Sequence, residues 1–321
     1  MDPMLYPVLA VLAGLTLLVW SADRFVAGAA ATARNLGMSP LLIGLTIVSF
    51  GTSAPEILVS VMASLNDSGS LAVGNALGSN IANIALVLGI TALIAPLPVK
   101  SGILKKEIPL LLAITLLACV LLFNLHLGPM DSIILLLALA GSLYLFSRFQ
   151  KNAGTDAIAS DDEALPDLAT GPAFFWLILG LVVLAGSSRL LVWGASEIAF
   201  AMGVSELVVG LTIVAIGTSL PELAASVASA LKKHHDIAIG NVVGSNIFNL
   251  VAVMAVPGLL SPTILEPAVF YRDAMVMFGL TLLLLAFALW QKPPSISRLE
   301  GSLLTAAYAV YLVLLYTMTV V

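Results

Sequence analysis

Long apolar runs fill most of the chain, and short polar segments separate them. Runs of this length predict membrane-spanning helices, because a helix needs roughly 20 apolar residues to cross a bilayer. Their continuity argues against a membrane β-barrel, whose strands alternate between apolar and polar residues. Ten spans are predicted, at 4–32, 41–65, 71–96, 104–126, 129–148, 173–202, 206–231, 237–261, 270–291 and 301–320. The first and sixth are long for a simple crossing, which predicts that both are tilted.

The two halves of this pattern repeat each other. A shift of 166 residues matches 44–60 to 210–226 at 11 of 17 positions, and 72–84 to 238–250 at 8 of 13. Each half holds five predicted spans, and because five is odd the second half is predicted to be inserted upside down relative to the first. Inverted repeats with interrupted helices are typical of secondary transporters, which bind their substrates near the bilayer midplane.

A polar segment at 150–171 separates the halves. It is acidic, rich in Ala and Gly, and without periodicity, so it predicts a flexible connector between a first repeat at 1–149 and a second at 172–321. With the N-terminus outside, eleven of the 13 Lys and Arg residues fall on the inner side. This bias predicts a multi-pass protein of the cell membrane with both termini outside and a cytoplasmic connector. Arg189 falls inside a span, opposite in charge to its repeat mate Asp23, and has no assigned role.

Composition agrees with a polytopic all-α membrane protein. Hydrophobic residues make up 60% of the 321 residues, charged residues make up 10%, and the mean hydropathy is +1.10. No basic cluster of the kind that binds nucleic acid is present, and the net charge of -5 comes partly from the connector. The single cysteine, Cys119, allows no internal disulfide and is expected to pack in an apolar run. The first apolar run lacks the features of a cleaved signal peptide, so it is expected to remain as a helix.

One short stretch inside the spans occurs twice. It reads GLTIVSFGTSAPE at Gly44–Glu56 and GLTIVAIGTSLPE at Gly210–Glu222. A carboxylate at membrane depth is costly and by default marks a functional site. Proline lacks an N–H group and clashes with the carbonyl four residues earlier. Both helices are therefore predicted to open beside their Thr and Ser hydroxyls, which leaves backbone carbonyls to line a cavity.

The span after each of these stretches carries a second polar pattern, GNALGSNIAN at 74–83 and GNVVGSNIFN at 240–249. The combined inventory is two carboxylates, hydroxyls, amide oxygens and backbone carbonyls, with no His or Cys. Hard oxygen ligands suit Na⁺ or Ca²⁺ and argue against zinc or copper. Two ionised glutamates carry a charge of about -2, which one Ca²⁺ or two Na⁺ would neutralise. Competition between one Ca²⁺ and two Na⁺ for the same site is a natural basis for exchanging these ions across the membrane.

Simpler interpretations exist for each feature taken alone. A Gly-Thr-Ser-x-Pro-Glu stretch could be a kink with a buried carboxylate, and the glycines could serve close helix packing. Asn75 and Asn241 could be structural hydrogen bonders. The duplication of all these features at one offset, in opposite predicted orientations, favours a shared site instead.

At these residues the sequence resembles the cation/calcium antiporter superfamily, and specifically its sodium/calcium exchanger branch. The two pattern pairs correspond to the two α-repeats of that family, and the likeness covers nearly all the predicted spans. The resemblance implies a ten-helix exchanger fold, with broken helices 2, 3, 7 and 8 forming the core. It also implies that helices 1 and 6 slide against this core during alternating access.

The resemblance carries ligand roles over to matching positions. The implied Na⁺ and Ca²⁺ ligands are Thr52, Ser53, Glu56, Ser79, Asn83, Thr218, Ser219, Glu222, Ser245 and Asn249. Ser49 and Ala215 occupy positions that resemble carbonyl-donating ligands of the family. No cofactor and no enzymatic activity are implied; the partners are the two transported ions and the lipid bilayer. The oligomeric state stays open, and a monomer is compatible with the sequence.

Two positions bear on which ions are exchanged. Several relatives carry an aspartate where this chain has Asn249, and potassium-dependent exchangers resemble the aspartate version. Proton-coupled relatives place a glutamate shortly after the Gly-Asn pair, where this chain has no acid. Both features favour Na⁺/Ca²⁺ exchange, and a proton-coupled or broad divalent-cation antiporter on the same fold is the alternative. A cation channel or a non-transporting scaffold is a more distant one.

Overall fold

The helices follow the apolar runs, and two of them are interrupted inside the first polar pattern, at Ser53 and Ser219. The computed structural model describes residues 4–153, 166–203, 213 and 215–320. The first half contains α1 (Leu5–Leu36), α2 (Pro40–Ile43), the π-helix η1 (Gly44–Val48), α3 (Ser49–Thr52), α4 (Ala54–Leu65), α5 (Gly69–Ala82), η2 (Asn83–Leu88), α6 (Gly89–Ile94), β1 (Leu97–Pro98), α7 (Ser101–Lys105), α8 (Glu107–Leu122), β2 (His126–Leu127) and α9 (Pro129–Ala153). The second contains α11 (Thr170–Ala201), α13 (Ala215–Thr218), α14 (Leu220–Leu231), α15 (His235–Phe248), η4 (Asn249–Val253), α16 (Ala255–Leu260), β3 (Thr263–Ile264), η5 (Val269–Ala274), α17 (Met275–Trp290), β4 (Ser295–Ile296) and α18 (Arg298–Val320).

The fold is that of a predominantly helical polytopic membrane protein. Among the described residues, seven helices are long and apolar enough to cross a membrane, and the bent pair Pro40–Thr52 and Ala54–Leu65 makes up to eight. The predicted span at 104–126 is the 16-residue α8, preceded by the short α7. The span predicted at 206–231 begins outside the described residues, and its described part contains α13 and α14.

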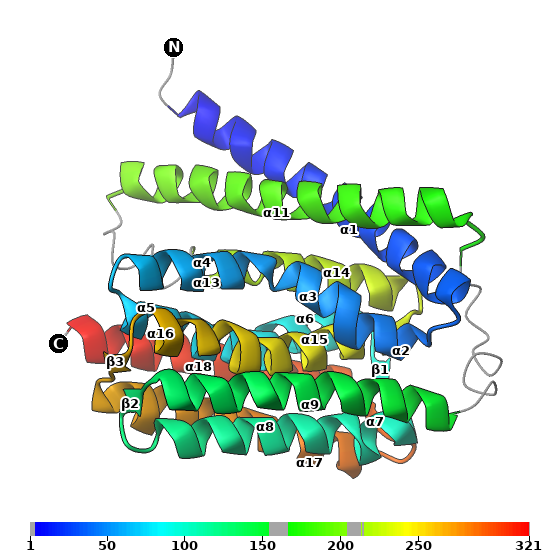
Figure 1. Cartoon of the computed structure of the whole chain (residues 1–321). Coiled ribbons are helices and arrows are strands. Elements are labelled where there is room, and N and C mark those ends of the chain that lie inside the picture. Colours follow the sequence, from blue (N-terminus) through cyan, green and yellow to red (C-terminus); the bar gives the residue numbers. More distant parts are fainter. Residues whose placement is uncertain (1–3, 154–165, 204–212, 214, 321) are drawn as a thin grey trace.

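The two longest helices, α1 and α11, pack together on one side of the molecule (Figure 1). Each has 32 residues, as the long first and sixth apolar runs predicted. Glycines bring their backbones close together. A Cβ atom on Gly180 would lie 2.7 Å from the Cα atom of Phe25, and one on Gly14 would lie 2.9 Å from the Cβ atom of Leu191. Gly14 and Phe25 are the 166-residue offset partners of Gly180 and Leu191, so the crossing is built from reciprocal contacts.

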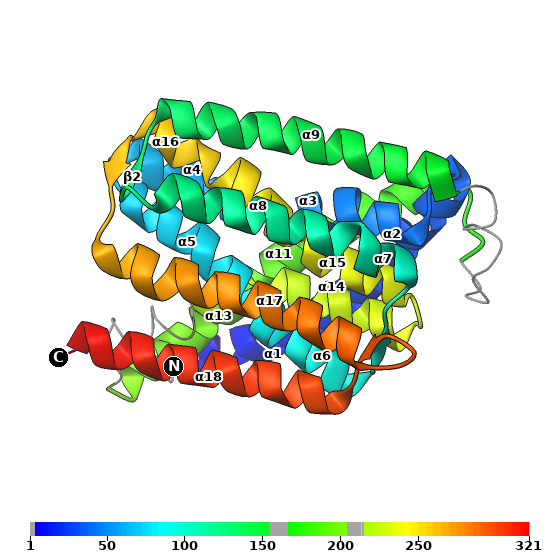
Figure 2. The same ribbon diagram turned by 90° about the horizontal axis from the view of Figure 1, so that it is seen from below.

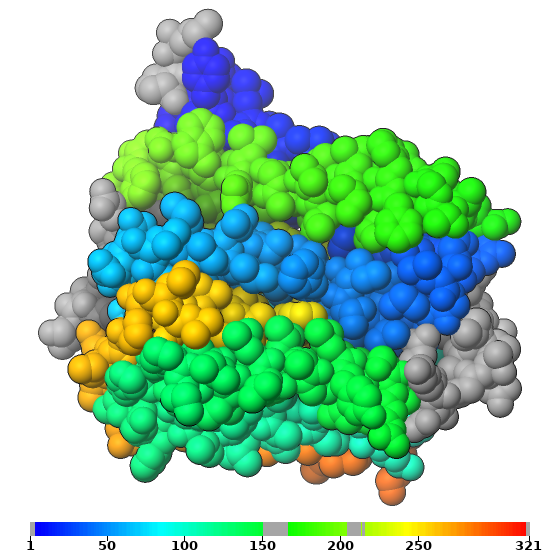
Figure 3. All heavy atoms as spheres, in the orientation of Figure 1, coloured from blue at the N-terminus to red at the C-terminus, as the bar shows by residue number. Residues whose placement is uncertain are grey.

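The helices that carry the second polar pattern lie at the centre. In the helix that α5 begins and that runs to Ile94, 78% of the residues in the most apolar 18-residue stretch are buried. In the helix that α15 begins and that runs to Leu260, the share is 83%. In the other long apolar helices the share is only 22–39%. Helices α8, α9, α17 and α18 cover the side away from α1 and α11 (Figures 1 and 2). The space-filling view shows α4 and α16 between α11 and α9 (Figure 3).

The first polar pattern interrupts its helices at the predicted place. Helix α3 ends at Thr52, α4 begins at Ala54, and the two segments are bent by 42°. The second half repeats the break, because α13 ends at Thr218 and α14 begins at Leu220. Each following helix has a proline in its first turn, where the missing N–H group costs no internal hydrogen bond.

Two short antiparallel strand pairs join the halves. Strand β1 pairs with β4 through Leu97↔Ile296, and β2 pairs with β3 through His126↔Ile264. Each pair combines one strand from the first half with one from the second. The halves are therefore linked at the loops as well as through the central helices.

Two ion pairs tie α1 to other segments. Arg34 pairs with Asp167 at 2.9 Å, while the other acidic residues of the connector lie outside the described residues. Asp23 pairs with Lys232, just beyond α14, at 2.7 Å, so its observed partner is not Arg189. Both pairs are partly or largely exposed, and such pairs contribute little to stability.

The close crossing of α1 and α11 makes a testable distinction between two glycines of α11. Gly180→Ala would press a methyl group into the backbone of α1, and we expect a loss of about 1–3 kcal/mol in stability. Gly186→Ala is the control, because no heavy atom lies within 4 Å of its added Cβ. It is expected to be neutral or slightly stabilising, since Ala favours a helix over Gly. Thermal unfolding in detergent would measure both, and equal stabilities would contradict the packing argument.

Candidate functional site: a cation site at the paired helix breaks

The two helix breaks meet at the centre of the molecule. The Ser53 hydroxyl, at the first break, lies 3.4 Å from the Glu222 carboxylate, which is in the first turn of α14. The Thr52 hydroxyl donates to the Asn241 side-chain oxygen at 3.1 Å and lies 3.4 Å from the Ser245 hydroxyl. The structure thus brings first-half and second-half residues together across about 170–190 positions of sequence.

The other predicted residues surround these contacts. Glu56 is in the first turn of α4, Ser79 lies beside its carboxylate, and Asn83 and Asn249 begin η2 and η4. All ten predicted ligands except Thr218 are buried. Thr218 is half-buried at the end of α13, and Ser219 lies at the second break.

Many polar atoms at this site lack a hydrogen-bond partner among the described residues. Both carboxylate oxygens of Glu56 and one of Glu222 are buried without a hydrogen bond of normal geometry. The same is true of three neutral side chains, whose polar atoms are buried without a hydrogen bond: the amides of Asn83 and Asn249 and the hydroxyl of Ser219. Buried polar groups are nearly always hydrogen-bonded, so a cluster of unsatisfied oxygens requires an explanation such as water or an ion.

The carboxylates also lack a cationic partner in the part of the chain that the structure describes. Among the described residues, neither Glu56 nor Glu222 forms an ion pair with Lys, Arg or His. The two glutamates are close enough to interact electrostatically with each other. Two uncompensated negative charges in a low-dielectric interior cost several kcal/mol each. A bound cation would offset this cost, and the available donors are hard oxygens that suit Na⁺ or Ca²⁺.

Within the described part of the chain, no softer metal site competes with this interpretation. The described residues contain no group of three or more His, Cys, Asp and Glu side chains that could hold a metal ion.

Ser49 is one of the two residues predicted to offer a backbone carbonyl to the cation. Its hydroxyl donates to the Gly44 carbonyl at 2.7 Å. Its own carbonyl accepts from the Ser53 N–H group at 3.0 Å and from the Thr52 hydroxyl at 3.3 Å. Ala215 is the first residue of α13.

Asn241 makes several hydrogen bonds between the helices at the site, as the interpretation of a structural hydrogen bonder predicts. Its amide nitrogen donates to the Ser226 hydroxyl at 2.9 Å and to the Glu222 backbone carbonyl at 3.2 Å, while its oxygen accepts from Thr52. These contacts hold the first turn of α14 against the break of the other half. Its offset partner Asn75 makes the corresponding contact to the Glu56 carbonyl at 3.4 Å.

Ser188 was not identified from the sequence. Pro221 clashes with the carbonyl four residues earlier, that of Gly217, and removes its usual helical donor. The Ser188 hydroxyl of α11 donates to this carbonyl at 2.8 Å. Its place beside Ser187 in a helix carries no signal for such a contact, because the partner is 29 residues away and is defined only by packing.

Two cavities border the site in the part of the chain that the structure describes. The larger, of about 510 Å³, is lined by Asn75, Ser79 and Thr218 at the site and by Ser70 and Glu266 toward one end of the molecule. The smaller, of about 270 Å³, lies beside Pro55, Ser188 and Thr218. Thr218 lines both, which accounts for its greater exposure.

Comparisons with known proteins agree with this chemistry. A family model described as sodium/calcium exchanger protein matches residues 6–148 and 172–317. The chain is 42% identical to the inner membrane protein YrbG of Escherichia coli, with 98% of both chains covered. It is 32% identical to the sodium/calcium exchanger MaX1 of Methanosarcina acetivorans, covering 96% of this chain and 98% of that one.

A solved structure has the same fold. The sodium-calcium exchanger NCX_Mj, in crystals soaked with zero Na⁺ and Ca²⁺, superposes with a TM-score of 0.83 at 33% sequence identity. The match covers 97% of this chain and 99% of that chain. The similarity therefore extends over the whole architecture that holds the paired breaks.

Two adjacent serines of α11 test how the second break is held. Ser188→Ala removes the donor to the Gly217 carbonyl and leaves a buried acceptor unsatisfied, so we expect a loss of about 1–3 kcal/mol. Ser187→Ala is the matched control, because its hydroxyl donates at 2.9 Å to the Leu184 carbonyl within its own helix. That change should cost less than about 0.5 kcal/mol. Equal midpoints of thermal unfolding for the two variants would disprove a special role for Ser188.

Proposed function

Because the chain belongs to the sodium/calcium exchanger family, a family of cation/Ca²⁺ antiporters, we propose that it exchanges Na⁺ for Ca²⁺ across the cell membrane. One observation carries the proposal. Glu56 and Glu222 come from opposite halves, are buried together, and have no cationic partner among the described residues. A central site of this kind is stabilised by a bound cation whenever both glutamates are ionised.

The proposed ligands divide into charged and neutral groups. Glu56 and Glu222 contact both kinds of ion and supply the charge. The hydroxyls complete the Na⁺ sites and the Ca²⁺ shell; they belong to Thr52, Ser53, Ser79, Thr218, Ser219 and Ser245. Asn83 and Asn249 are neutral ligands or position the glutamates. The carbonyls of Ser49 and Ala215 are further proposed oxygen ligands, and an ion at the Ser49 carbonyl would replace the contact from the Thr52 hydroxyl.

Charge balance explains why the two ions exclude each other. One Ca²⁺ or two Na⁺ would neutralise a pair of ionised glutamates, and either load would offset the cost of burying them. An empty site would keep two close carboxylates uncompensated in the membrane. In this mechanism the site can switch its accessibility from one side of the membrane to the other only when Ca²⁺ or Na⁺ is bound. Because each switch must carry an ion, the two ions are transported in opposite directions, which is antiport.

Alternating access is proposed to arise from two inverted five-helix repeats, ten helices in all, at 1–149 and 172–321. The reciprocal contacts of Gly14 and Gly180 across the α1–α11 crossing support this arrangement, because a pseudo-two-fold axis produces such pairs. The proposed orientation has both termini outside and the connector at 150–171 in the cytoplasm. The larger cavity then opens outward, and α1 and α11 slide against the core to change access.

Coupling to Na⁺ is favoured over coupling to H⁺ or K⁺. Asn249 is neutral and lies at a buried helix junction, where an aspartate would resemble potassium-dependent relatives. The two Gly-Asn stretches of α5 and α15 carry no acid that could take up the coupling proton. A proton-coupled or broad divalent-cation antiporter remains the second candidate, since it needs only the same two glutamates.

The first functional prediction concerns the carboxylates. Glu56→Gln and Glu222→Gln should each reduce Na⁺-gradient-driven Ca²⁺ uptake into proteoliposomes by roughly 100-fold or more, because each removes a charge that the bound cation needs. Glu197→Gln is the control, since Glu197 is exposed on α11 and outside the site, and it should leave uptake unchanged. Full uptake by either site variant would disprove the assignment.

The choice of coupling ion is tested in the same vesicles. Uptake driven by a Na⁺ gradient and unaffected by K⁺ supports the proposal, whereas uptake driven by a pH gradient without Na⁺ supports the second candidate. Ca²⁺ flux with no counter-ion gradient would indicate a channel. A protein that binds no ion and tolerates loss of both glutamates would be a scaffold.

The second functional prediction concerns pH. Only ionised carboxylates neutralise a cation, so Ca²⁺ binding is favoured at high pH and lost as the pH falls through the range where they become protonated. The apparent affinity should fall by up to about tenfold per pH unit for each carboxylate that must release a proton. Ca²⁺ titrations of the purified protein at several pH values would measure the slope, and Glu222→Gln should reduce it by one proton. An affinity that does not change with pH would contradict the model.

A further inference from the structure

The mouth of the larger cavity is charged, and this charge has no role in the site itself. The 510 Å³ cavity runs from Ser79 and Thr218 to a mouth lined by Glu266, Arg272 and Asp273. Any ion that takes this route to the glutamates passes these three side chains. Their combined formal charge is negative, with one guanidinium between two carboxylates.

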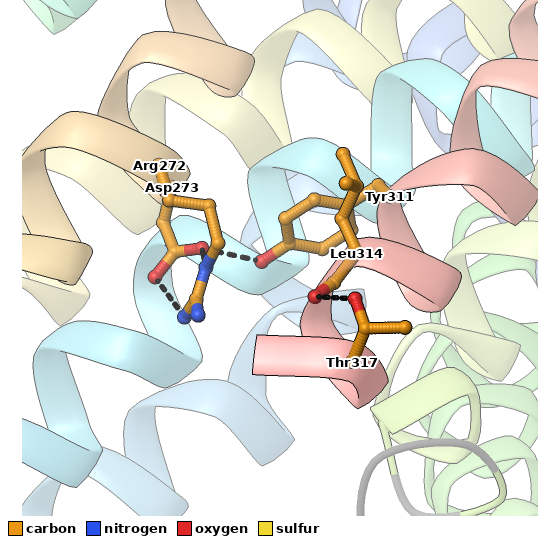
Figure 4. Close-up of polar contacts among 5 residues, drawn as sticks. All are labelled: Arg272, Asp273, Tyr311, Leu314 and Thr317. Atoms are coloured by element: carbon orange, nitrogen blue, oxygen red, sulfur yellow. Dashed lines mark hydrogen bonds and ion pairs between the residues drawn. The ribbon is translucent and has the colours of Figure 1, made fainter. Parts of the chain in front are cut away.

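Arg272 and Asp273 form a tight pair on the π-helix η5 (Figure 4). The guanidinium donates from Nε to one carboxylate oxygen at 2.7 Å and from a terminal nitrogen to the other at 3.0 Å. Neighbouring residues of a helix do not ordinarily face each other, so the arginine must fold back along the helix surface. The Tyr311 hydroxyl of α18 donates to the same carboxylate at 2.9 Å. With both oxygens occupied, Asp273 is held at the cavity wall and is mostly buried.

A second pocket at the other end of the molecule is the offset counterpart of this mouth. It has a volume of about 250 Å³, and its lining includes Lys106, Glu107, Phe146 and Phe149. The 166-residue offset relates these four to Arg272, Asp273, Leu312 and Leu315, which line the first cavity.

The two pockets differ in depth and in charge. The first reaches Asn75, Ser79 and Thr218, whereas the second is lined on its inner side by Leu41, Leu42 and Leu45. Glu266 at the first mouth is replaced at the second by its offset partner Lys100, which pairs with Asp236 at 2.8 Å. The first mouth is thus the more negative of the two.

We propose that the Arg272–Asp273 pair sets the effective charge at one mouth of the cation pathway, and that Lys106 and Glu107 do the same at the opposite mouth. Clefts lined by one sign of charge concentrate counter-ions and raise their rate of entry. Glu266 and Asp273 attract cations to the first mouth, and Arg272 limits that attraction so that ions pass on to the central site. These residues influence entry and do not bind the transported ion at the centre. The inference rests on the proposed exchange of Na⁺ for Ca²⁺.

Removing the negative and the positive member of the pair should shift the KM for Ca²⁺ uptake in opposite directions. This separates an effect of charge from a loss of structural support, which would have the same sign in both variants. At low ionic strength Asp273→Asn should raise the KM for Ca²⁺ uptake by about three- to tenfold, because it leaves Arg272 uncompensated. Arg272→Gln should lower the KM by a similar factor, and the double variant should lie near the wild type. The maximal rate should stay unchanged, and both shifts should shrink at high salt because the mouth is solvent-accessible.

Measuring uptake from each side of the membrane in turn supplies a matched control. Ca²⁺ uptake would be measured in Na⁺-loaded right-side-out and inside-out membrane vesicles. Asp273→Asn should change KM in one vesicle type only, and Glu107→Gln in the other only. Asp167→Asn, an equal charge change at an exposed surface pair, should have no effect in either. Tyr311→Phe, which keeps the charge, should also leave KM near the wild-type value.

The outcomes separate this inference from the proposed function. A wild type with no Na⁺-driven Ca²⁺ uptake would overturn the proposed function itself. With wild-type uptake intact, KM values unchanged in Asp273→Asn and Arg272→Gln would overturn only the role of the mouth. Reduced maximal rates in both variants, with no salt dependence, would show that the pair serves to support the helix and not to set the charge.

Discussion

Uncompensated negative charge inside the membrane is the constraint on which the rest of the structure depends. Glu56 and Glu222 are buried together, and no cationic side chain of the described residues pairs with either. Removing such charges from water is costly unless a counter-charge and polar contacts replace the lost hydration. The breaks at Ser53 and Ser219 provide those contacts, because each exposes hydroxyls and backbone groups beside a carboxylate. A broken helix at this depth is tolerated only where it lines such a site.

The scaffold holds the two breaks in different ways, although the sequence repeats. The second break is fixed by Ser188, which donates to the Gly217 carbonyl, and by Asn241, which bonds Ser226. The first half has Ala22 at the position that corresponds to Ser188. Its Ser60 donates at 2.9 Å to the Val253 carbonyl of the other half, whereas its offset partner Ser226 accepts from Asn241. Among the contacts described, the Ser60 bond thus adds a link between the halves near the first break, and the Ser188 bond adds a link within the second half at the second break.

Charge also organises the approach to the centre. The cavity that reaches Ser79 and Thr218 begins at a mouth where Arg272 is bound to Asp273 and lies near Glu266. Its counterpart at the opposite end holds Lys106 and Glu107 and does not extend past the apolar side chains of α2 and η1. A duplicated chain can thus present two related mouths with different charges and different depths. A central site that binds both Na⁺ and Ca²⁺ would then meet different local ion concentrations on its two sides.

The sequence alone was sufficient for the helical membrane class, the two long helices and the positions of the breaks. Each follows from local rules: apolar length predicts spans, and proline with glycine predicts an interruption beside Glu56 and Glu222. The identities between residues 166 positions apart were also enough to nominate the residues of one shared site. Most of these residues lie buried around the breaks. Only the tertiary structure decided which groups meet. The contacts of Thr52 with Asn241, Ser188 with Gly217 and Asp23 with Lys232 join segments distant in sequence, and no local pattern encodes a partner that packing alone selects.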